Sequence, residues 1–94
     1  MNARELTLNI AVNLGRISRW AMEGKQIRIS QFLEETAGYL KELENSPRNP
    51  RFEKTYQLFK NSFSVLKNNP KLNYEWAEDM LTWANILTHR SKLA

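Results

Sequence analysis

The chain has 94 residues, 41% of them hydrophobic, with a formal net charge of +4 and no cysteine. That length suits one domain, in which roughly 60–65% of the unfolded chain's surface is buried on folding. The absence of cysteine excludes disulfides, thiol nucleophiles and thiolate metal sites. No apolar run approaches the roughly 20 residues of a membrane span, and charges interrupt the first residues where a signal peptide needs an apolar stretch. We therefore expect a cytoplasmic globular domain with no membrane partner.

The first predicted helix covers residues 3–23. Asn2 is a suitable N-cap, and Glu5 lies three residues later at the capping-box position. Gly24 follows the helix as a natural C′ residue because it adopts a positive φ without steric cost. One face of this helix carries apolar residues at helical spacing, namely Leu6, Ile10, Leu14, Ile17 and Ala21.

Three further helices are predicted, over residues 30–44, 50–67 and 74–90. Ser30, Asn49 and Asn73 are their expected N-caps, because their side chains accept hydrogen bonds from the free N–H groups of a first turn. Pro50 suits the first position of the third helix, where a missing N–H costs nothing. Residues 25–29 form the predicted connector after the first helix. The expected core is largely aromatic, comprising Trp20, Phe32, Phe52, Tyr56, Phe59, Phe63, Trp76 and Trp83.

The connections between these helices are short, which favours antiparallel packing of helices that follow one another in the chain. Nothing in the sequence predicts a sheet. The expected fold is therefore an all-α, single-domain bundle of about four antiparallel amphipathic helices joined by short loops. Gly38 falls on the outer side of the second helix, where it costs about 1 kcal/mol relative to alanine. Close approach of another backbone and a tolerated defect both remain as explanations.

The sequence contains no recognisable catalytic constellation. His89 is the only histidine, and no visible partner supports a role in acid–base catalysis. Glu75, Glu78 and Asp79 share one side of the last helix and carry oxygen ligands suited to a divalent cation. Acidic residues in a first turn also complement the helix dipole without any metal. We therefore expect a protein that is not an enzyme and has no catalytic residue, metal site or cofactor.

The first helix has a second apolar side, roughly opposite the main one. Its members follow a heptad-like series and comprise Leu8, Val12, Gly15, Arg19 and Met22. A helix that is apolar on two sides is either sandwiched within its own domain or shared with another chain. The second interpretation predicts a protein–protein interaction module, with a homodimer or partner interface on these residues. Alternating basic and acidic segments would suit two-fold pairing of two copies.

The alternative hypothesis is a small nucleic-acid-binding regulator, because phosphate contacts need clustered lysine and arginine. Its expected contacts come from the third helix and the connector, namely Lys25, Arg28, Lys54, Lys60 and Lys67. At 100° per residue, Lys60 and Lys67 lie within about 20° of each other, but Lys54 is more than 100° from both. The basic residues of the third helix therefore form a loose ring and not a single stripe.

Two segments, ISQFLEETAGYLKEL (Ile29–Leu43) and WAEDMLTWANILTHR (Trp76–Arg90), give the chain a family resemblance. In style and length the chain resembles the short, uncharacterised helical proteins found in cyanobacteria. The resemblance extends over most of the chain but rests on no specific motif. It implies a helical fold, and it implies no activity and no site residues.

Overall fold

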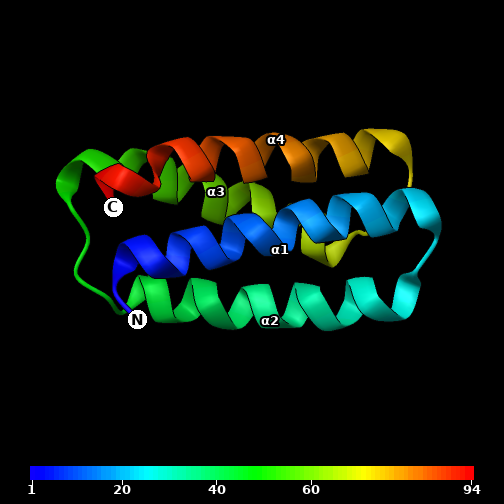
Figure 1. The fold of residues 1–94 in the computed structure, drawn as a ribbon, viewed down its shortest axis with the longest axis horizontal. Coiled ribbons are helices and arrows are strands. Elements are labelled where there is room, and N and C mark those ends of the chain that lie inside the picture. The colour runs from blue at the N-terminus through cyan, green and yellow to red at the C-terminus, as the bar shows by residue number, and fades with distance from the viewer.

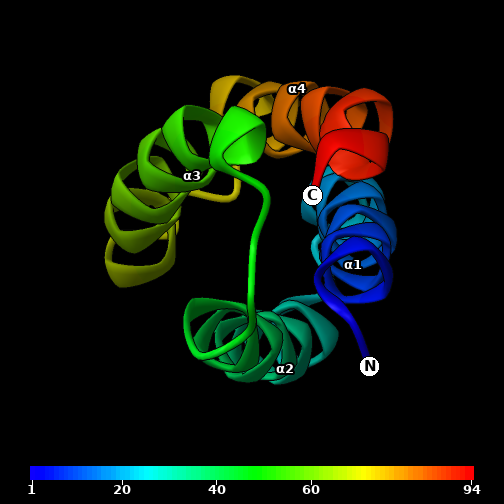
Figure 2. The ribbon, with the colours of Figure 1, turned by 90° about the vertical axis from the view of Figure 1, so that its left-hand side faces the viewer.

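The computed structural model describes all 94 residues and contains four α-helices and a final 3₁₀ turn: α1 (Ala3–Glu23), α2 (Gln26–Glu44), α3 (Pro50–Asn68), α4 (Tyr74–Arg90) and η1 (Ser91–Leu93). Each helix runs antiparallel to the next, and the molecule measures 37 × 19 × 18 Å (Figure 1). Seen from one end, the four helices surround a common core, with α1 and α3 on opposite sides (Figure 2). The predicted all-α bundle is confirmed.

Local capping explains where most of the helices begin and end. Asn2, Asn49 and Asn73 each accept a backbone N–H hydrogen bond of 2.8 to 2.9 Å at a helix start. Gly24 ends α1 with a φ of 71°, in the left-handed region that favours glycine. These predicted caps are confirmed, because each asparagine satisfies one of the first-turn N–H groups that have no partner inside the helix.

The predicted start of the second helix at Ser30 is wrong. The helix α2 begins at Gln26, and Lys25 occupies the cap position without a capping hydrogen bond from its side chain. The reason lies in the core, because Ile29 is buried one helical turn before Leu33. A helix that started at Ser30 would leave Ile29 outside this apolar face. Burial therefore overrides the local preference of serine for a cap, and the connector shortens to two residues.

The helix α1 packs most closely against α4 and α2, while α3 stands further from its neighbours. Small side chains allow the close approach of α1 and α4: the Ser18 hydroxyl donates a 2.7 Å hydrogen bond to the backbone carbonyl of Ala77. The face of α3 that points into the bundle is instead built from large rings, namely Phe52, Tyr56, Phe59 and Phe63. These rings fill the centre and hold the α3 backbone away from the other helices.

Six of the eight aromatic residues expected in the core are buried, and Phe32 and Trp83 are half-buried at its edge. The Phe32 ring lies edge-on to Trp20, with ring centroids 4.7 Å apart. The Trp83 ring packs against Phe59 at 5.4 Å. Because Phe59 already occupies the centre, Trp83 reaches the surface between α3 and α4.

The loop between α2 and α3 is fixed by one arginine. The Arg48 guanidinium donates hydrogen bonds to the backbone carbonyls of Leu43 and Glu44 at 2.7 and 2.9 Å, and so satisfies the end of α2. It also forms two hydrogen bonds with the Glu53 carboxylate, at 2.9 and 3.1 Å. The central carbon of its guanidinium, Cζ, lies 4.1 Å from the centroid of the Tyr56 ring. One side chain thus joins the end of α2, the loop and the first turns of α3.

Replacing Gly38 and Gly24 by alanine is expected to change the free energy of unfolding in opposite directions. A Cβ added at Gly38 would meet no atom within 4 Å, so Gly38→Ala is expected to raise the free energy of unfolding by about 1 kcal/mol. Gly24→Ala is expected to lower it by about 1 kcal/mol, because alanine is strained at positive φ. Urea unfolding of both variants measures the two changes. A loss of stability in Gly38→Ala would contradict the prediction.

Candidate functional site

The second apolar side of α1 faces solvent. The side chains of Val12 and Met22 are 51% and 59% exposed, and Arg19 is also exposed. Leu8 and Gly15 are half-buried. The main apolar stripe of α1 packs against α2 and α4, and the opposite side is only partly covered. The interpretation of these residues as intramolecular core is therefore wrong for Val12 and Met22. We call the set Leu8, Val12, Gly15, Arg19 and Met22 the α1 outer face.

The α1 outer face continues onto α4. The hydrogen bond between the two helices sets their antiparallel register. In that register Gly15 is level with Met80, next to Leu81, and Met22 is level with Asn73, next to Tyr74. The side chains of Leu81 and Tyr74 are exposed. The exposed apolar residues of α1 therefore form one edge of a broader surface.

Gly15 lies at the middle of the α1 outer face, in the interior of a helix. A Cβ added there would meet no atom within 4 Å. No contact in the chain therefore requires glycine at this position. A helix-interior glycine costs about 1 kcal/mol relative to alanine, so Gly15 weakens the isolated helix.

The five residues expected to contact nucleic acid are not brought together. Arg28 lies near the α1–α2 turn with its guanidinium over the Trp20 ring, 5.6 Å from the centroid, and Lys54 is exposed on α3. Three of the five lie in ion pairs with glutamates at 2.8 to 3.0 Å, namely Lys25, Lys60 and Lys67. The nucleic-acid hypothesis gains no support from this placement.

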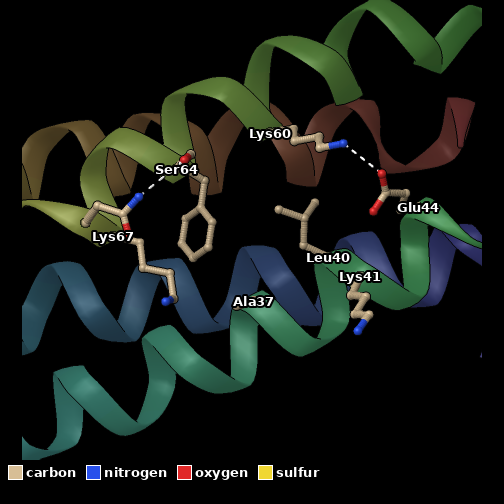
Figure 3. A pocket seen from close by; sticks show the side chains of 9 residues that line it. Ala37, Leu40, Lys41, Glu44, Lys60, Ser64 and Lys67 are labelled. Atoms are coloured by element: carbon tan, nitrogen blue, oxygen red, sulfur yellow. Dashed lines mark hydrogen bonds and ion pairs between the residues drawn. The ribbon is translucent and has the colours of Figure 1, made fainter.

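Two of these ion pairs bridge a groove of about 410 Å³ between α2 and α3. In the close view, Leu40 of α2 points into the groove and Lys60 reaches Glu44 at 2.8 Å (Figure 3). Phe63 of α3 also lines the groove. Lys67 crosses from α3 to Glu34 of α2 at 2.9 Å. The lysines that reach across this groove are therefore already neutralised by carboxylates of α2.

The bridge at Glu44 also shifts the ionisation of both partners. The hydrogen bond from Lys60, followed by its charge, lowers the pKa of Glu44 below its ordinary value of 4.5. The same hydrogen bond raises the pKa of Lys60 above 10.5. Both groups are solvent-exposed, so they join α2 to α3 without marking a site of proton transfer.

A third surface, which the sequence analysis missed, lies between α3 and α4. Leu58 and Val65 of α3 are 53% and 68% exposed, and Ile86 of α4 is exposed beside the half-buried Trp83. Three adjoining hollows of about 410, 350 and 200 Å³ run along this surface. The spacing of seven residues between Leu58 and Val65 is the sequence signal that would have indicated it. We call Leu58, Val65, Trp83 and Ile86 the α3–α4 face.

No three histidine or acidic side chains come together in an arrangement that could hold a metal ion. None of the helices combines the length and the apolar content required to span a lipid bilayer.

The buried hydroxyl of Tyr56 has no hydrogen-bond partner, and burial is the main cause that raises its pKa. Its ring lies under the Arg48 guanidinium, which is bound to backbone carbonyls and Glu53.

Comparison with known proteins finds no matching family model, no matching characterised protein and no matching solved structure. The resemblance to cyanobacterial helical proteins therefore stays a prediction.

Proposed function

We propose that this protein is a non-catalytic helical interaction module that pairs with a second copy of itself through the α1 outer face. One observation carries the proposal: Val12 and Met22 are more than half exposed on either side of a helix-interior glycine that no contact in the chain requires. Exposed apolar side chains gathered on one face are typical of protein–protein contacts.

The α1 outer face is symmetric about Gly15. When two copies of α1 pack antiparallel with their Gly15 residues opposed, Leu8 of one copy lies opposite Met22 of the other. In the same register Val12 lies opposite Ser18, and the adjacent Arg19 lays its aliphatic stem on apolar surface while its charge stays in water. A face that matches itself under a two-fold axis is the requirement for an isologous dimer.

The ends of the face tolerate this antiparallel pairing, and its centre favours it. Arg4 and Glu5 lie at one end of α1, and Glu23, ion-paired with Lys25, lies at the other, so each end carries both signs of charge. Gly15 at the centre allows the two backbones to approach closely, which is a common use of glycine. The stability that Gly15 costs the isolated helix is then offset by contact between copies.

Light scattering coupled to gel filtration tests this pairing. Val12→Glu replaces an apolar side chain of the contact with a carboxylate that loses its hydration there, so we expect at least about tenfold weaker association, or about 1.4 kcal/mol. Gly15→Ala is expected to weaken association too, while it raises the stability of the monomer. Gln31→Glu, an exposed change on α2, adds the same charge away from this face and serves as the matched control. An association unchanged by Val12→Glu would overturn the proposal.

A further inference from the structure

We infer that the α3–α4 face is a second and independent self-association surface, whose occupant is another copy of this chain. It lies on a different side of the bundle from the α1 outer face: α1 and α3 occupy opposite sides of the core (Figure 2). The two surfaces share no residue. Association through the α3–α4 face therefore does not depend on the proposed α1 pairing.

The centre of the α3–α4 face is apolar and hollowed. Leu58 and Val65 stand on α3, one on each side of Ser62, and Trp83 and Ile86 line the opposite wall on α4. The three hollows share lining residues, Trp83 between two of them and Val65 between the next two, so they form one continuous depression.

The charges that flank this centre are segregated along α4. Glu75 and Asp79 line the hollow at the beginning of α4, and His89 and Arg90 line the one at its end. None of these four side chains takes part in an ion pair within the chain, in contrast to the lysines of the α2–α3 groove. Lys71 is the one cation that lines the acidic end. The α3–α4 face thus offers unpaired charges of opposite sign at its two ends.

This charge pattern selects one symmetric arrangement of two copies. A two-fold axis that crosses the helices reverses their direction, so that the acidic start of α4 lies over the basic end of the second α4. The same axis sets Leu58 opposite Val65. A two-fold axis parallel to the helices would instead set α4 over the second α3, so that the two ends of α4 would not meet each other. Only the first arrangement brings the acidic start of one α4 to the basic end of the other.

A stable dimer needs both helices of this side of the bundle. A standard interface buries about 800 Å² on each partner. The bundle measures 37 Å along its axis and 19 Å across, so a contact must cover nearly one whole side of it to approach that area. A contact through α3 or α4 alone would be too small. The exposed apolar residues of the α3–α4 face do come from both helices, as such a contact requires.

The experiment compares the native chain with Val12→Glu, Val65→Glu and the variant that carries both changes, by light scattering at several concentrations. With two isologous faces, the native chain is expected to be larger than a dimer, each single variant a dimer and the double variant a monomer. Val65 is exposed, so the substitution is expected to leave folding intact, and the urea midpoint checks this. Gln31→Glu is again the charge control.

The outcomes separate the two surfaces. A native assembly that Val65→Glu leaves unchanged overturns this inference, whatever Val12→Glu does. An assembly that Val65→Glu dissociates and Val12→Glu leaves intact supports the inference and overturns the proposed α1 pairing.

Charge reversal tests the orientation of the copies. Arg90→Glu alone is expected to weaken the association at least about tenfold, and the addition of Glu75→Arg in the same chain is expected to restore it. Rescue would support the crossed axis, because the two residues then meet between copies. A double variant that associates no better than Arg90→Glu would overturn the charge-based arrangement.

Discussion

The replacement of Phe59 by alanine is expected to lower the free energy of unfolding by about 3–5 kcal/mol, because a buried ring leaves both lost apolar burial and a cavity. Phe59 is 1% exposed and packs against the rings of Phe63 and Trp83, with centroids 5.4 Å away in each case. A domain of this size has a net stability of about 5–10 kcal/mol, so the variant would be close to unfolding at room temperature. Urea denaturation followed by far-UV circular dichroism measures the change.

The matched control for this substitution is Ile27→Ala. Ile27 is 77% exposed at the start of α2, so its truncation is expected to change stability by no more than about 0.5 kcal/mol. Both variants are measured at two protein concentrations, so that association between copies does not enter the comparison. Equal effects at the two positions would contradict the placement of the Phe59 ring at the centre of the bundle.

The second large effect is expected at Arg48. Arg48→Ala removes the hydrogen bonds to the last carbonyls of α2, the paired bonds to Glu53 and the contact with the Tyr56 ring. We expect a loss of about 2–3 kcal/mol, since hydrogen bonds of charged groups contribute about 1.5–3 kcal/mol and the carbonyls lose their partner. Arg48→Lys is expected to recover only part of this, because an ammonium cannot reproduce the planar fork.

Acid titration distinguishes the share of Glu53 in this effect. The hydrogen bond from Arg48 lowers the pKa of the Glu53 carboxyl below its ordinary value of 4.5. A lowered folded-state pKa stabilises the protein above the unfolded pKa, and that stabilisation disappears as the pH falls through the folded value. The stability difference between the native chain and Arg48→Ala should therefore narrow between pH 5 and pH 3. A difference that stays constant over this range would show that the Glu53 pair contributes nothing.

Much of the fold could be predicted because the helix ends carry strong local signals. Asn2, Gly24, Asn49 and Asn73 each act within one turn of their own position, and the structure places caps at all four. The start of α2 could not be predicted in the same way. Ser30 is a good local cap, but the burial of Ile29 depends on α1, which no local signal reveals.

The exposed faces could be predicted only in part. The sequence shows that α1 is apolar on two sides, but not which side is covered, since that depends on where α2 and α4 pack. Leu58 and Val65 carried a heptad spacing that the inward aromatic stripe of α3 obscured. The half-exposure of Trp83 follows from the space taken by Phe59, which is a property of packing and not of the sequence pattern.

The contact between α1 and α4 also constrains how the chain folds as it is synthesised. The hydrogen bond from Ser18 to Ala77 joins residues 59 positions apart, and α4 is the helix that α1 contacts most closely. Ribosomes add about 5–20 residues per second, so several seconds pass between the synthesis of α1 and that of α4. During that interval only α2 can cover its main apolar stripe. The nascent chain therefore exposes part of this apolar stripe until α4 has left the ribosome and the bundle closes.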